Sequence, residues 1–102
     1  MKNFILILII VFSISVNAKA DRAVVVATFG TCDYFVADGP KGLYVLEWYG
    51  GKFPIEGDVF FGDVGSYGMK EIEYEGGSTG RVWVEDFLET SSAAASEIRD
   101  HC

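Results

Sequence analysis

The sequence predicts a mainly β protein, a small antiparallel barrel of five to six strands with a short C-terminal helix. Short runs rich in β-branched and aromatic residues recur along the chain, and turn signals built from Gly, Pro and Asp separate them. All twelve glycines lie after residue 20, which indicates many tight turns. Six strands and one helix in so short a chain favour an SH3-like or OB-like barrel, with a two-sheet sandwich as the alternative.

The central pair of predicted strands comprises residues 43–49 and 58–64, joined by a loop with Gly-Gly, Phe-Pro and Glu-Gly-Asp. In the first of these, Tyr44, Leu46 and Trp48 share one face, opposite to that of Glu47, and are assigned to the core. In chain order, the six predicted strands are residues 23–29, 33–37, 43–49, 58–64, 69–75 and 81–86.

The last two strands are predicted to form a hairpin, because apolar and polar residues alternate on both sides of a turn at residues 76–80. One register places the apolar side chains of both strands on one face. The pairs in that register are Glu75–Arg81, Tyr74–Val82, Glu73–Trp83, Ile72–Val84 and Glu71–Glu85. In this register Glu71 and Glu85 face each other on the outer side. Like charges in this position are destabilising, which indicates a role other than stability for this pair.

After residue 90 the pattern changes to that of a helix. Ser91 and Ser92 offer a capping hydroxyl, the alanines that follow favour helix, and Ile98 is the large apolar residue available for docking. The sequence therefore predicts a helix over residues 92–99.

The first twenty residues are predicted to be a secretory signal peptide, and residues 21–102 a single barrel domain. Lys2 precedes an apolar segment at residues 4–16, and small residues allow cleavage after Ala18 or Ala20. The apolar segment is short for a membrane span of about 20 residues, although an uncleaved anchor is the alternative. We expect a secreted or periplasmic protein that does not associate with a membrane after cleavage.

The predicted mature chain is strongly acidic. Six basic residues and fifteen acidic residues follow residue 20, which gives a formal net charge of −9. Such a surface repels phosphate backbones, so the sequence disfavours nucleic-acid binding.

Two cysteines, Cys32 and Cys102, lie in the mature region. In an oxidising compartment the simplest arrangement is one intramolecular disulfide. An intermolecular bridge through Cys102 and two free thiols are the alternatives.

Several short motifs in the mature region carry a resemblance. They are WYGG at residues 48–51, GD at 57–58 and 62–63, SYG at 66–68 and RVWVEDF at 81–87. With these motifs the chain resembles small secreted bacterial β-barrel proteins of unknown function, over most of residues 21–102. The resemblance implies a secreted barrel and brings no activity or catalytic residue.

The residue types argue against an enzyme. The single histidine, His101, is expected to be exposed and without a role, so a catalytic triad has no base. Neighbouring carboxylates such as Asp58 with Asp63, or Glu85 with Asp86, are expected in so acidic a chain. We therefore expect no metal and no other cofactor.

A calcium loop is also disfavoured, because apolar residues stand between Asp58 and Asp63 where oxygen ligands should be. Both aspartates are instead expected to cap turns beside their glycines.

The predicted binding site is the outer face of the hairpin, with Trp83 as an anchor beside Glu71, Glu73 and Glu85. A Trp next to carboxylates suits a positively charged partner through cation–π and charge contacts. The predicted function is a non-catalytic binding module for a cationic protein, peptide or cell-wall component. The alternative is a small hydrolase that acts on cell-wall glycans with two carboxylates.

Overall fold

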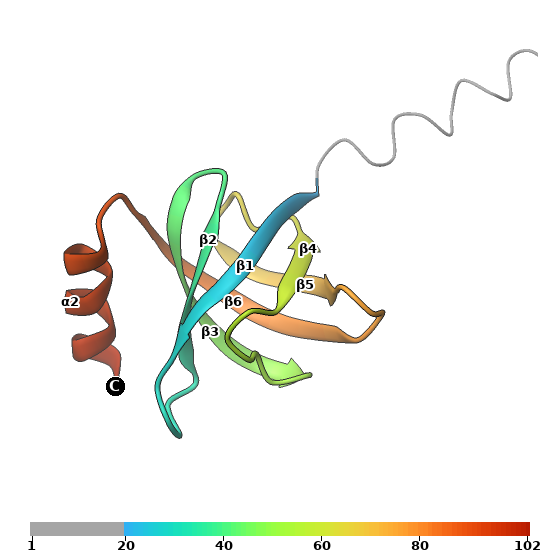
Figure 1. Ribbon diagram of the computed structural model, residues 1–102, viewed down its shortest axis with the longest axis horizontal. Coiled ribbons are helices and arrows are strands. Elements are labelled where there is room, and N and C mark those ends of the chain that lie inside the picture. Colours follow the sequence, from blue (N-terminus) through green and yellow to red (C-terminus); the bar gives the residue numbers. More distant parts are fainter. Residues whose placement is uncertain (1–19) are drawn as a thin grey trace, which may run out of the picture.

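A computed structural model describes residues 20–102 as a closed antiparallel barrel with one helix packed on its outside (Figure 1). The predicted signal peptide, except for its last residue, lies outside the described residues. The strand order around the barrel is β1-β2-β3-β6-β5-β4. The predicted fold class, a mainly β barrel with a short C-terminal helix, is confirmed.

All six predicted strands are present, with bounds that differ by a few residues. The elements are β1 (Asp21–Thr28), β2 (Tyr34–Gly39), β3 (Gly42–Gly51), β4 (Val59–Gly62), β5 (Gly68–Tyr74), β6 (Thr79–Leu88) and α2 (Ser91–His101). The helix is longer than predicted, and its N-cap is Thr90 rather than a serine: the Ala93 amide donates to Thr90 Oγ1 at 3.1 Å.

Side chains from all six strands fill the barrel. Tyr44 and Leu46 are fully buried there and Trp48 packs against them, as the alternation in β3 predicted. The inner core consists of Ala23, Val25, Phe35, Ala37, Tyr44, Leu46, Phe60, Val64, Ile72, Tyr74, Val82 and Val84. The barrel is therefore filled with side chains and is not a channel.

A second apolar cluster lies outside the barrel, beneath α2. Val36 and Val45 point outward from β2 and β3 and are covered by Ala94 and Ile98 of the helix. The docking role predicted for Ile98 is confirmed. Within residues 20–102 no helix is long and apolar enough to cross a membrane.

A disulfide between Cys32 and Cys102 fixes the end of α2 to the loop between β1 and β2. The intramolecular bridge predicted from the sequence is therefore confirmed. It joins residues 70 positions apart in sequence, so it ties the last helical turn to the first hairpin of the barrel.

The register predicted for the β5–β6 hairpin is wrong. The structure pairs Glu71 with Arg81, Glu73 with Thr79, and Met69 with Trp83. Consequently Glu71 and Glu85 do not face each other, and the like-charge pair expected from the sequence does not exist.

The register differs because the turn is earlier and tighter than predicted. The Tyr74 amide donates to the Ser78 carbonyl at 2.7 Å, so β6 begins at Thr79. Gly80 then faces inward opposite Ile72, and a Cβ atom at Gly80 would lie only 3.2 Å from the Tyr74 ring. The absence of a side chain at Gly80 gives the ring of Tyr74 its space.

Candidate functional site

A row of polar and aromatic side chains crosses the outer surface of three neighbouring strands. Tyr34 of β2 pairs with Glu47 of β3, which pairs in turn with Trp83 of β6. Tyr49 and Glu85 extend this row along β3 and β6. We call these five residues the aromatic–acidic face: Tyr34, Glu47, Tyr49, Trp83 and Glu85.

Two β-bulges between β3 and β6 place Tyr49 and Glu85 on this face. Trp48 pairs with Val82 and Gly50 with Arg81, which leaves Tyr49 as the extra residue. Likewise, the step in register between Val45 and Leu46 leaves Glu85 as the extra residue on β6. A bulge bends its strand and re-aims the side chain, and bulges are frequent beside functional sites.

The electrostatic environment of the face is negative. Partial burial, a hydrogen bond to Glu47 and the charges of Glu47 and Glu85 raise the pKa of Tyr34 to about 12. The charge of Glu47, followed by desolvation, a hydrogen bond to Glu47 and the charge of Glu85, raises the pKa of Tyr49. Both tyrosines therefore experience the negative charge of these two carboxylates.

Trp83 lies at the β6 end of the cross-strand row and is partly exposed to solvent. The residue is 37% exposed, and its Nε1 donates a hydrogen bond to Glu85 Oε1 at 3.1 Å. Tyr49 is 53% exposed. Within residues 20–102, no ion pair joins Glu47 to a basic side chain.

The end of α2 borders the face. The His101 ring stacks on the Tyr34 ring with centroids 4.3 Å apart and planes 14° apart. Its Nε2 atom lies 3.5 Å from Glu97 Oε2 and 3.9 Å from Glu85 Oε2. His101 is exposed, as the sequence predicted, but it also makes these contacts, because the disulfide at Cys102 holds this residue against β2.

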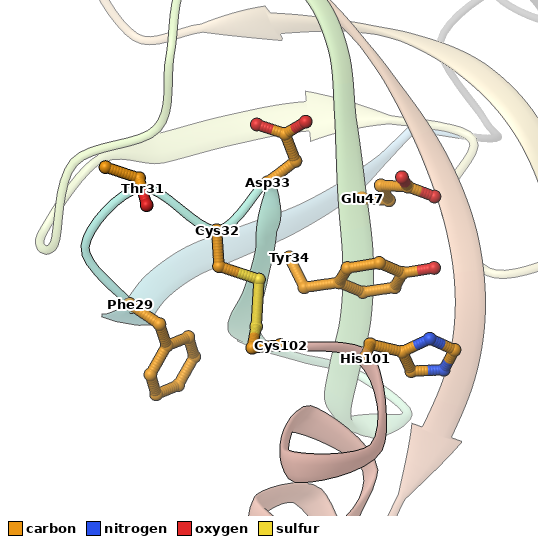
Figure 2. A pocket seen from close by; sticks show the side chains of 8 residues that line it. All are labelled: Phe29, Thr31, Cys32, Asp33, Tyr34, Glu47, His101 and Cys102. Carbon is orange, nitrogen blue, oxygen red and sulfur yellow. A yellow bond between two sulfur atoms is a disulfide. The ribbon is translucent and has the colours of Figure 1, made fainter.

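A hollow adjoins the face at this border. Figure 2 shows its walls, with the Tyr34 ring between the Glu47 carboxylate and the His101 ring, and with the disulfide beside them. The lining residues are Phe29, Thr31, Cys32, Asp33, Tyr34, Glu47, His101 and Cys102. The hollow thus offers two carboxylates, Asp33 and Glu47, next to aromatic surfaces.

The structure brings together only part of the predicted site. Trp83 and Glu85 are joined by a hydrogen bond. Glu71 instead accepts a hydrogen bond from Arg81 Nε at 2.6 Å, and Glu73 lies opposite Thr79 at the turn end of the hairpin. These two glutamates therefore do not belong to the aromatic–acidic face.

Sequence reasoning missed Glu47, Tyr49 and Tyr34. Glu47 and Tyr49 alternate with the core residues of β3, so the outward side of that strand was a usable signal. Tyr34 carried no such signal, because its place beside Glu47 depends on the pairing of β2 with β3.

Asp58 caps a turn, as the sequence predicted. Its Oδ2 accepts hydrogen bonds from the Ile55 amide at 2.9 Å and from Lys52 Nζ at 2.5 Å. Desolvation opposes the charged form, but these bonds and the Lys52 charge keep the pKa of Asp58 below its ordinary value. Asp63 makes a longer contact, 3.7 Å, with Lys70 Nζ.

The chain matches no protein-family model, no curated protein and no solved structure.

Proposed function

We propose that this protein is an extracytoplasmic, non-catalytic binding module that holds a cationic segment of a protein or peptide on its aromatic–acidic face. The observation that carries the proposal is the cross-strand row of Tyr34, Glu47 and Trp83, in which a carboxylate without a basic partner lies between two aromatic rings.

The chemistry of this row suits a Lys or Arg side chain. An ammonium or guanidinium group over the open side of Trp83 would gain a cation–π contact and the charge of Glu47 at the same time. The hydrogen bond from Trp83 Nε1 to Glu85 restrains the indole, so less side-chain freedom is lost on binding. Acidic faces of this kind also speed the encounter with cationic partners.

The disulfide supports the extracytoplasmic part of the proposal. Such bonds persist in oxidising compartments, and this one holds α2 beside the face. Secretion itself is expected from the signal peptide predicted at residues 1–20.

A fluorescence titration with a hexalysine peptide, in buffer that contains EDTA, tests the proposal. Trp48 packs against the inner core while Trp83 is partly exposed, so a change in emission reports on the face. Trp83→Ala should abolish the signal change, and Glu47→Gln should weaken binding at least fivefold at low salt.

Glu75→Gln is the matched control, because it removes the same charge from an exposed glutamate at the β5–β6 turn. It should change affinity little. Equal losses in Glu47→Gln and Glu75→Gln would show that only the overall negative charge attracts the peptide, and the proposed face would then be wrong.

A further inference from the structure

Three side chains of two elements meet beside the aromatic–acidic face. Glu97 and His101 are four residues apart on α2, and Glu85 projects from the bulge of β6. One carboxylate oxygen of each glutamate and one imidazole nitrogen all lie within 4.8 Å of one another. Each of the three side chains is about 30% exposed, so they are partly withdrawn from water (28% for Glu97, 29% for His101, 31% for Glu85).

We propose that Glu85, Glu97 and His101 bind a zinc ion through Glu85 Oε2, Glu97 Oε2 and His101 Nε2. One imidazole and two carboxylates are donors that Zn²⁺ accepts, and three protein ligands leave a fourth position for water or another ligand. Because Zn–N and Zn–O bonds are about 2.0–2.2 Å long, neighbouring ligand atoms of a tetrahedral site are about 3.4 Å apart.

Two of the three separations are close to that value, and the third, between the two glutamate oxygens, is at most 4.8 Å. His101 Nε2 is 3.5 Å from Glu97 Oε2, and 3.9 Å from Glu85 Oε2. Rotation of the glutamate side chains would bring the three atoms closer to the geometry of a single bound ion.

Neighbouring groups already orient these ligands as the outer partners of a metal site do. Trp83 Nε1 binds Oε1 of Glu85 and leaves Oε2, the oxygen nearer His101, without that partner. The Tyr34 ring restrains the His101 ring by stacking, and the disulfide at the adjacent Cys102 anchors the helix end. Such outer partners commonly change metal affinity 10–100-fold when they are removed.

The same distances would also occur if a protonated His101 simply formed ion pairs with the two glutamates. The two arrangements differ in their response to a metal ion. A set of ion pairs does not bind a metal ion. A zinc site does, and binding requires the imidazole to lose its proton so that the ion can take its place.

Titration calorimetry of the oxidised protein with Zn²⁺ tests the site. Wild-type protein should bind one Zn²⁺ per chain, and His101→Ala, Glu97→Gln and Glu85→Gln should each weaken binding at least tenfold. Glu75→Gln, an exposed glutamate outside the cluster, is the control and should bind as wild type does. Mg²⁺ and Ca²⁺, which prefer six or more oxygen ligands, should bind far more weakly than Zn²⁺.

Co²⁺ gives a second measurement that does not depend on affinity alone. Bound Co²⁺ should produce visible absorption bands of a four-coordinate ion and quench Trp83, whose indole donates to a ligand carboxylate. Trp83→Phe keeps all three ligands but removes this hydrogen bond, and should weaken Zn²⁺ binding by about tenfold.

If His101→Ala disturbed the docking of α2, circular dichroism would show it, and Glu97→Gln would still test the site. Undetectable Zn²⁺ binding by the wild type, or affinities of all three ligand variants equal to that of Glu75→Gln, would overturn the proposal. The metal titration contains no peptide, and the peptide titration contains EDTA, so the two proposals can fail separately.

Discussion

The outer surface of β2, β3 and β6 has two ends with opposite characters. At one end, Val36 and Val45 are apolar and lie beneath α2. At the other end, Tyr49 and Trp83 are exposed to solvent and Glu47 is half-buried. The change occurs within one strand: Val45 is fully buried and Tyr49, four residues later on the same face, is 53% exposed.

This difference indicates the structural role of α2. It covers the apolar end and stops where the acidic and aromatic residues begin, with His101 at the boundary. The disulfide secures that stopping point. Because α2 covers only the apolar end, the open end is the part of this surface that remains available for a partner.

The largest expected effect comes from weakening the covered end. Ile98→Ala removes the main apolar contact of α2 and should lower the free energy of unfolding by about 2–4 kcal/mol, the usual cost of truncating a buried isoleucine. Urea denaturation of the oxidised protein measures this change.

Tyr49→Ala is the matched substitution at the open end and should leave the urea midpoint close to that of the wild type, because the ring is mostly in solvent. If Tyr49→Ala destabilised the protein as much as Ile98→Ala does, the open end would also contribute to stability, and the contrast between the two ends would be wrong.

A smaller effect concerns the charge on the open end. Glu47→Gln removes the negative charge next to Tyr34, so the pKa of Tyr34 should fall from about 12 toward 10, with partial burial retaining some of the shift. Ultraviolet absorption during an alkaline titration follows the phenolate, and Glu75→Gln should leave this pKa unchanged.

The sign of the accompanying stability change follows from the raised pKa. The unfolded chain loses the Tyr34 proton at lower pH than the folded protein does, so stability is intact below pH 10 and declines as pH rises toward 12 (with the folded pKa at about 12). Glu47→Gln should make that decline shallower. A Tyr34 pKa that did not move would show that Glu47 does not contribute to the shift.

Much of the fold could be predicted because its causes are local. Alternation placed Tyr44 and Leu46 in the core, glycine-rich turns separated the strands, and two cysteines in an expected oxidising compartment implied one disulfide. The binding face could be predicted only in part, since Tyr34 reaches Glu47 through strand pairing and Glu85 reaches His101 through helix docking.

The register of the β5–β6 hairpin could not be predicted for a simpler reason. Side chains in a strand alternate with a period of two, so sliding β6 by four residues keeps every side chain on its original face. The hydrophobic pattern is therefore equally satisfied with Glu71 opposite Glu85 or opposite Arg81. The turn chemistry and the inward Gly80 select the second arrangement.

The smallest expected effect tests that register directly. Glu71 and Arg81 are both well exposed, so their ion pair should contribute only a few tenths of a kcal/mol to stability. A double-mutant cycle with Glu71→Gln and Arg81→Gln should show a favourable coupling of this size in urea denaturation, and it should shrink as salt screens the charges.

The companion cycle, with Glu71→Gln and Glu85→Gln, should show no coupling, because the two side chains no longer oppose each other. In the register predicted from the sequence, the same cycle would reveal repulsion of up to about 1 kcal/mol, and the Glu71–Arg81 cycle would show no coupling. Each register therefore predicts coupling in one of the two cycles and none in the other. A measured Glu71–Glu85 repulsion would therefore place Glu73 opposite Trp83 and Glu71 opposite Glu85, and would add both carboxylates to the acidic face.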